Sequence, residues 1–443
     1  MKRVLKKILY AIPPLRRFGV HVMYRYKEAA YERLTRGIVP DPKRIMFCAF
    51  SGRRYDCSPR AIFEAMQADS AYADYTFVWC FIHPSEFSDM HTLAGAKVVK
   101  IGSEEYFREM AQCAYWIFNT RVPPWIKKHA GQTYVQTWHG TPLKKLGFDV
   151  ERYMTGADDK QSLQESYLTD AKRFDYLLSP SPFYTKAMTS AFHLDALGKE
   201  DAIVELGYPR NDSLYVPKLD ADLEPEMLAM FCKQYQIPDG KKIILYAPTW
   251  REGNLKPAEG YGFSEGIDFQ FGMNLRAFLD RLGEEYIVFV RAHYFVRRFL
   301  KAGEYGNRVF DFSDYHTLNT LYHLSDVLVT DYSSVFFDYA ILKKPMVFYM
   351  YDLEGYKDVR DFYLPLTQLP GEIVTEEARL ADAVKDAIEK NNEPEVQARY
   401  EAFNQTYNPI PGPCSLSVIS YILEEKATEL SVRVEETLWR KSH

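Results

Sequence analysis

The chain has 443 residues, of which 47% are hydrophobic, and a formal net charge of −5. This length exceeds one typical domain and suits two, each with enough apolar residues for a core. The near-neutral charge excludes a protein that binds nucleic acid through its overall charge, so any affinity for anions must be local. The 6 cysteines form no C-x-x-C pair, which is typical of reduced, buried thiols and not of a disulfide framework or a zinc site.

The first 36 residues are strongly basic. They carry 10 Lys or Arg against two Glu, and apolar and aromatic residues lie between the cations. This pattern is typical of a segment on an anionic membrane surface, although a solvated basic helix would look similar. Pro13 and Pro14 interrupt any single long helix. The segment has neither a secretory signal pattern nor the roughly 18 apolar residues of a membrane span. We predict that residues 1–40 associate with the membrane surface.

Short apolar runs then alternate with longer amphipathic ones, which predicts an α/β domain over residues 41–217. The expected strands are Arg44–Phe50, Tyr75–Ile82, Lys97–Ile101, Tyr115–Asn119, Tyr134–Thr137 and Tyr176–Ser179. Residues 218–240, which contain several acids together with Pro225, Pro238 and Gly240, interrupt this rhythm. We predict an interdomain linker there.

A second α/β domain is predicted over residues 241–412. Its expected strands are Lys242–Tyr246, Tyr286–Val290, Arg308–Phe310, Val327–Thr330 and Met346–Tyr349. The glycine-rich insert 253–272 is interpreted as a long surface loop, and residues 413–443 as a closing segment with a helix over Leu416–Leu438. Ligands of open α/β sheets bind at the carboxyl ends of the strands, so we expect the site where two such domains face each other across a cleft.

The stretch Gln136–Asp149 contains the strongest candidate for catalysis. His139 follows an apolar strand and precedes Gly140, which allows a sharp turn that exposes the ring. An imidazole titrating near neutrality is a natural base for an alcohol. On the acceptor or phosphate side we predict Gly140, Thr141 and the pair Lys144 and Lys145, whose ammonium groups suit phosphates. A structural histidine is the alternative.

The second domain repeats this arrangement. His293 follows a strand beside Arg291, whose guanidinium can bind phosphate oxygens with two hydrogen bonds. The segment Thr330, Asp331, Tyr332, Ser333 and Ser334 ends another strand before an apolar helix. Its N-terminal N–H groups could bind an anion, with the serine hydroxyls as further donors, and simple capping is the alternative.

Three further polar residues end strands. Arg251 could reach phosphate or pair with Glu252, whereas Arg210 and Asp212 could face the cleft or only shape their turn. The sequence lacks a P-loop, an H-E-x-x-H zinc motif and a G-x-S-x-G elbow. No carboxylate cluster demands a metal, so we expect no cofactor, and Mg²⁺ could enter only through substrate phosphates.

Seven ordered motifs resemble the CDP-glycerol glycerophosphotransferase family of teichoic acid synthesis: QTWHGTPLKKLGFD, LLSPSPFY, GYPRND, YAPTWRE, RAHYF, VTDYSSVFFDYAILKKP and LPGEIV. The resemblance implies a GT-B fold with an acceptor-binding first domain and a donor-binding second domain. It also implies transfer of glycerol phosphate from CDP-glycerol to an undecaprenyl-linked glycan, with release of CMP, at the cytoplasmic face of the membrane.

Carried onto this sequence, the resemblance makes His139 the base on the acceptor hydroxyl. It places His293 and Arg291 at the donor diphosphate, and Asp331, Ser333 and Ser334 along the donor site. Asp361 and the segment 412–415 depart from the family's usual pattern. CDP-ribitol, a capsule glycan, a nucleotide-sugar glycosyltransferase and a catalytically silent membrane-bound scaffold are therefore the alternatives.

Overall fold

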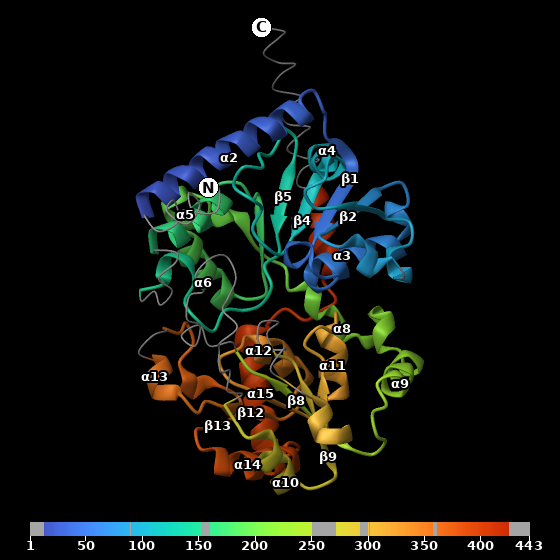
Figure 1. The fold of residues 1–443 in the computed structure, drawn as a ribbon, viewed down its shortest axis with the longest axis vertical. Helices are drawn as coiled ribbons and strands as arrows, with labels where there is room; N and C mark the ends of the chain where they lie inside the picture. Colours follow the sequence, from blue (N-terminus) through green and yellow to red (C-terminus); the bar gives the residue numbers. More distant parts are fainter. Residues whose placement is uncertain are drawn as a thin grey trace, which may run out of the picture.

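The computed structural model describes residues 13–88, 90–151, 160–249, 272–292, 300, 302–357 and 361–424. Two parallel sheets, each covered by helices, lie one above the other in Figure 1. This confirms the predicted α/β class. Two expected features, the insert 253–271 and the end of the closing helix beyond Glu424, lie outside the described residues.

The first sheet has seven strands in the order β3-β2-β1-β4-β5-β6-β7, and each neighbouring pair is parallel. The strands are β1 (Asp41–Cys48), β2 (Thr76–Phe81), β3 (Lys97–Lys100), β4 (Cys113–Phe118), β5 (Thr133–Gln136), β6 (Tyr176–Ser179) and β7 (Ile203–Glu205). Because strand order reverses between β1 and β4, the loops after these strands flank the switch point where such sheets bind ligands.

Helices cover both faces of this sheet. They are α2 (Pro13–Thr35), α3 (Cys57–Ala68), α4 (Glu104–Gln112), α5 (Lys160–Ala171), α6 (Pro182–Phe192), α7 (Leu194–Leu197) and α8 (Asp212–Tyr215). Helices α2, α4, α5 and α6 contribute to one core cluster, and α3 to the other. Local sequence fixes the helix starts: the Ser103 hydroxyl accepts from Tyr106 N–H in α4, and Ser181 accepts from Tyr184 N–H in α6, with Pro182 at the first position.

The second sheet has six parallel strands in the order β10-β9-β8-β11-β12-β13. The strands are β8 (Lys242–Ala247), β9 (Tyr286–Val290), β10 (Val309–Asp311), β11 (Val327–Thr330), β12 (Met346–Tyr349) and β13 (Glu372–Val374). Its helices are α10 (Leu275–Leu282), α11 (Leu318–Leu324), α12 (Val335–Tyr339), α13 (Leu353–Lys357), α14 (Glu377–Lys390) and α15 (Pro394–Tyr407). The predicted strands of both sheets are found to within a few residues, whereas the short β13 was not expected.

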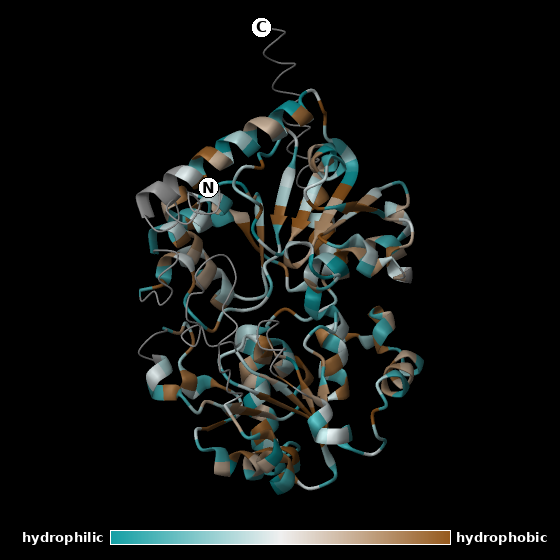
Figure 2. Ribbon diagram, viewed as in Figure 1, coloured by the Kyte–Doolittle hydropathy of each residue, from teal (hydrophilic) through white to brown (hydrophobic). Residues whose placement is uncertain are grey.

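The chain passes between the two sheets twice. Helix α9 (Pro225–Gln234) lies in the predicted linker. After α15, residues 415–424 form a helix whose Val418, Ile419 and Ile422 are buried in the first domain's core, and this red segment lies behind β4 in Figure 1. Figure 2 shows hydrophobic residues along the strands of both sheets, as expected for strands covered on both faces.

Helix α2 belongs to the first domain's packing. It begins at Pro13, a position that proline tolerates because the first helical N–H groups have no intrahelical acceptor. Tyr31 is buried in the core, and Lys127 pairs with Glu28 and Glu32 on the helix. Within the described residues, no helix is both long and apolar enough to cross a membrane.

Candidate functional site

His139 lies in a sharp turn directly after β5. Trp138 has a left-handed φ of 51° and Gly140 a φ of 145°, both of which are unusual for residues with a side chain. Buried polar contacts hold the turn: Trp138 N–H donates to Gln136 Oε1 at 2.9 Å, and Gly140 N–H donates to the Tyr208 hydroxyl at 2.8 Å. Gln136 is itself held by Asp170, to which its Nε2 donates at 3.2 Å. The turn is therefore fixed by side chains from outside the motif.

One hydrogen bond sets the tautomer of His139. Its Nδ1 lies 2.7 Å from the main-chain oxygen of Asn119, and a carbonyl oxygen can only accept, so Nδ1 carries the proton. The lone pair is then on Nε2. The ring stacks on Trp138 at 4.6 Å between centroids and meets the edge of Phe50 at 5.9 Å. This orients Nε2 as a proton acceptor.

Burial is the main reason why the pKa of His139 falls from 6.5 to about 4. The Asn119 carbonyl works against this shift, and the nearby cations Arg210 and Arg121 add to it. The ring is thus neutral at pH 7, as a general base must be before it takes a proton. A bound anion would raise this pKa, because negative charge favours the imidazolium.

The loop after β1 packs beside the histidine in a strained conformation. Phe50 and Ser51 have φ values of 48° and 56°. Asn119 Oδ1 accepts from Phe50 N–H at 2.7 Å, and Thr120 Oγ1 accepts from Ser51 N–H at 3.0 Å. Asn119 therefore fixes both the strained loop, through its side chain, and the histidine ring, through its carbonyl. Such strain often marks functional sites.

The turn of His139 meets the second domain at Gly140. A Cβ added there would lie 2.9 Å from Ser334 Oγ and 3.8 Å from Arg210 Nη1, so only glycine fits. Arg210 in turn forms a buried ion pair of 2.8 Å with Asp338 on α12. The structure thus brings together four predicted site residues, His139, Gly140, Arg210 and Ser334, from two domains.

The lysine segment crosses to the second domain beside residues 356–363. Lys144 Nζ lies 3.3 Å from the Tyr356 hydroxyl, and Lys145 Nζ lies 3.2 Å from Glu151. The main chains also join, since Lys145 N–H donates to Asp361 O at 2.9 Å and Tyr363 N–H donates to Leu143 O at 2.8 Å. Asp361, which departs from the family's usual glycine, takes part through its backbone. The lysines are therefore placed at the junction of the domains.

The predicted donor residues of the second sheet make local contacts. The buried Thr330 donates to Ala247 O at 2.7 Å, and Asp331 Oδ1 accepts from Thr249 N–H at 2.8 Å. Ser333 is half-buried, and Thr141 on the first domain is buried. Helix α12 has only 5 residues, and the Ser334 hydroxyl makes no capping hydrogen bond, so capping does not explain Ser334.

Two arginines from different domains converge on the turn 312–315. Arg291 Nη1 donates to Phe312 O at 2.6 Å and to Ser313 O at 3.0 Å. Arg54, after β1, donates to Ser313 O at 3.2 Å and to Tyr315 O at 3.3 Å. Arg291 thus has a structural role that its sequence position did not show, and Arg54 was missed. Arg251 and His293 lie outside the described residues, so their roles stay predictions.

Asp212 caps the helix that begins at 415. Its carboxylate accepts from Cys414 N–H and Ser415 N–H, both at 2.9 Å, and from the Ser415 hydroxyl at 2.6 Å. Burial raises its pKa, and these hydrogen bonds oppose the shift. The segment Gly412–Ser415, which departs from the family pattern, is thus where the chain re-enters the first domain, and of the two readings of Asp212 these contacts favour a structural role.

Arg60 joins the first domain to the linker and to the second domain. Its guanidinium contacts Glu64 at 2.8 Å, Asp220 at 2.9 Å, Asp222 at 3.1 Å and the Thr317 hydroxyl at 2.9 Å. The sequence analysis did not single out this residue. The acids of the linker were the only available signal, because the partner of an acid 160 residues away cannot be read from sequence.

The described residues contain no group of three or more His, Cys, Asp or Glu that could hold a metal ion. The cations described above, and not a carboxylate cluster, are therefore the groups in this part of the chain that could face a phosphorylated substrate.

Comparison with known proteins gives a consistent result. The model of the family CDP-Glycerol:Poly(glycerophosphate) glycerophosphotransferase matches residues 31–422. The chain is 36% identical to a teichoic acid glycerol-phosphate transferase of Staphylococcus aureus, over 80% of this chain and 86% of the relative. It is also 36% identical to a teichoic acid poly(glycerol phosphate) polymerase of Staphylococcus epidermidis, over 82% of this chain but 48% of the relative. The chain thus spans about half the length of that polymerase.

Among solved structures, the wall teichoic acid polymerase TagF is similar with a TM-score of 0.77 and 31% identity, over 98% of this chain and 99% of that one. The similarity extends to a TagF variant soaked with CDPG, with a TM-score of 0.79 and 32% identity over 96% of this chain and 99% of that one. The match covers both α/β domains and supports the predicted GT-B-like fold.

Proposed function

Because the chain belongs to the CDP-glycerol:poly(glycerophosphate) glycerophosphotransferase family, we propose that it transfers glycerol phosphate from CDP-glycerol to a hydroxyl of a lipid-linked glycan. The observation that carries this proposal is the neutral His139, oriented with Nε2 as acceptor, at the point where the two domains meet. This is the geometry that activating an alcohol requires.

In the proposed reaction, Nε2 of His139 takes the proton of the acceptor hydroxyl. The hydroxyl oxygen attacks the phosphorus that bears the glycerol, a new P–O bond forms, and the bond from this phosphorus to the bridging oxygen breaks. That oxygen leaves with CMP, and water or the leaving phosphate takes the proton from the imidazolium. The product is the acceptor extended by one glycerol phosphate, so atoms and charge balance.

The donor would lie along the second domain, beside Ser334 and the segment from Thr330. Its diphosphate needs positive charge nearby. Arg210 and Lys144 are the described cations closest in sequence and contact to the His139 turn, and Arg251, Arg291 and His293 remain candidates. We infer no resident metal, and Mg²⁺ would enter only with the substrate phosphates.

The relatives support glycerol phosphate as the transferred group, since the S. aureus relative is a glycerol-phosphate transferase. We infer that the acceptor is linked to undecaprenyl diphosphate and that the protein works as a peripheral protein at the cytoplasmic face of the membrane. The basic α2 favours this location because cations between exposed apolar residues suit an anionic surface.

The test is CMP release by the purified protein from CDP-glycerol with a lipid-linked disaccharide acceptor. CDP-ribitol and UDP-sugars run in parallel. We expect release with CDP-glycerol and a loss of at least about 100-fold in His139→Ala, the usual contribution of a general base. His83→Ala, at an exposed histidine, is the matched control and should keep full activity.

Turnover by a folded His139→Ala protein at the native rate would refute the base role. Turnover with CDP-ribitol or a UDP-sugar alone would reassign the donor, and binding without turnover of any donor would favour the scaffold alternative.

A further inference from the structure

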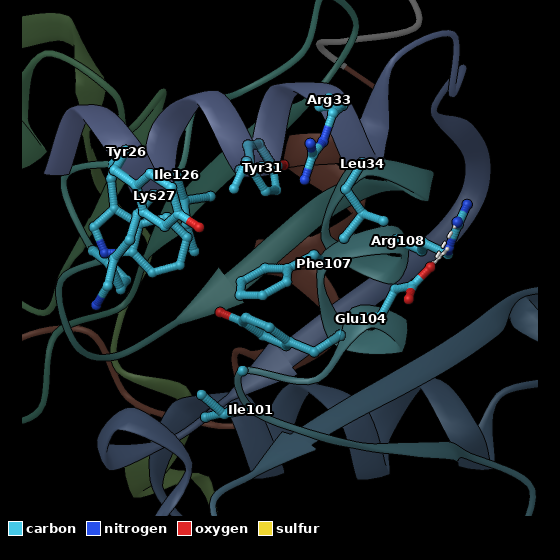
Figure 3. Close-up of a pocket in the computed structure, with 15 residues that line it drawn as sticks. Tyr26, Lys27, Tyr31, Arg33, Leu34, Ile101, Glu104, Phe107, Arg108 and Ile126 are labelled. Atoms are coloured by element: carbon cyan, nitrogen blue, oxygen red, sulfur yellow. Dashed lines mark hydrogen bonds and ion pairs between the residues drawn. The ribbon is translucent and has the colours of Figure 1, made fainter. Parts of the chain in front are cut away.

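A large pocket lies beneath helix α2, away from the His139 turn. Its volume is about 750 Å³, within the range of pockets that hold small-molecule ligands. Figure 3 shows Tyr31 projecting from α2 toward Phe107, with Ile126 to one side and Ile101 below. The pocket is thus formed between α2, α4 and the loops after β3 and β4.

The inner surface of this pocket is apolar and aromatic. Tyr31 and Ile126 are buried, and Phe107 and Trp125 pack edge to face with centroids 5.5 Å apart. Leu34 closes one end from α2. These side chains would favour a hydrocarbon ligand, because burying its surface removes apolar area from water.

The rim of the same pocket is cationic. Lys27, Arg33 and Arg108 are exposed around its mouth, against the single acid Glu104, which pairs with Arg108 at 2.8 Å. An apolar interior with a positive rim is complementary to an amphiphile that has a hydrocarbon tail and an anionic head.

The Tyr31 hydroxyl gives a second, independent sign of a ligand. It is buried, and none of the residues that the structure describes forms a hydrogen bond with it. Burial raises the pKa of Tyr31, so the group keeps its proton and remains a donor. An unpaired buried hydroxyl is costly, and a ligand oxygen would satisfy it.

An apolar stripe leads from the outer surface of α2 into the pocket. Val22 and Met23 are exposed, Tyr26 is exposed and also lines the pocket mouth, and Ala30 and Leu34 line its interior. Positions 22, 26, 30 and 34 are spaced by four residues and share one face of the helix. A chain entering from a membrane along this stripe would stay in contact with apolar side chains.

We propose that this pocket binds one hydrocarbon chain of an anionic membrane phospholipid, with the headgroup among Lys27, Arg33 and Arg108. The inference rests on the proposed membrane location but not on catalysis. Binding would anchor α2 at the surface more firmly than charge alone.

The test measures binding of octyl, decyl and dodecyl phosphate to the full chain. Each added methylene should lower Kd about fourfold while the pocket fills. A bromine on the chain should quench the fluorescence of Trp125, and Trp125→Phe should lose this quenching. Inorganic phosphate should bind far more weakly, because it lacks the chain.

Two variants of neighbouring alanines form a matched pair. Ala30 lines the pocket, whereas Ala29 is exposed on the same helix. Ala30→Phe should abolish the dependence on chain length and weaken sedimentation with phosphatidylglycerol vesicles, and Ala29→Phe should change neither. Tyr31→Phe should weaken binding about fivefold without lowering the melting temperature.

Equal effects of Ala29→Phe and Ala30→Phe would overturn the proposal, since they would show binding to the surface alone. Binding of farnesyl phosphate without binding of alkyl phosphates would also overturn it and point to the tail of the lipid-linked acceptor. His139→Ala should bind alkyl phosphates normally, so failure of this inference and failure of the transferase proposal give different results.

Discussion

The depressed pKa of His139 predicts an unusual pH dependence. With a pKa of about 4 the imidazole is about 97% neutral at pH 5.5, whereas at its ordinary value of about 6.5 it would be about 9% neutral. The value of kcat/KM, which reports the free enzyme, should therefore fall only as the pH approaches 4, and at pH 5.5 should be about tenfold higher than an ordinary histidine allows.

The bound donor should shift this limb upward. Its phosphates carry negative charge that favours the imidazolium, so the acid limb of kcat should lie above that of kcat/KM. Phe50→Ala should also raise the limb of kcat/KM toward 6.5, because Phe50 covers one edge of the ring and its removal admits water.

The assay is CMP release from pH 4.5 to 8, with NMR titration of ¹³C-labelled histidine, the resonance being assigned with His139→Gln. The same shift fixes a sign for stability: the unfolded state binds this proton more tightly, so stability is complete above about pH 6.5 and is lost as the pH falls toward 4. A kcat/KM limb near 6.5 in the native protein, unchanged in Phe50→Ala, would refute the assignment of burial as the cause.

Three other substitutions test the junction of the domains. Arg60→Met leaves buried carboxylates without their cation and should lower the free energy of unfolding by about 3–5 kcal/mol, whereas Arg108→Ala, which loses one exposed pair, should cost less than about 1 kcal/mol; urea titration compares them, and equal losses would contradict the burial argument. Gly140→Ala should lower kcat, because the methyl group would meet Ser334 Oγ at 2.9 Å, and Ser334→Ala in the same chain should restore part of it; no recovery would exclude this contact as the cause. Asp212→Ala should destabilise by about 1–2 kcal/mol through loss of the cap on helix 415–424, seen as faster proteolysis near the C-terminus, and unchanged cleavage would show that the cap does not hold this helix.

The sequence by itself determined the local features of this protein. Runs of apolar residues marked nearly all strands, because strands buried on both faces need them. Only β13 was missed, since Glu372–Val374 is too short to form a pattern. The turn at His139 was also visible, because a glycine after a strand-ending histidine is a local signal.

Only the tertiary structure decided how these features act together. The Asn119 carbonyl selects the tautomer of His139, and Arg54 and Arg60 reach across to turns and acids far along the chain. The pocket beneath α2 likewise exists only where that helix packs on α4. Sequence periodicity shows which face a residue occupies but not which distant residue faces it, because long-range contacts arise from the folding of the whole chain.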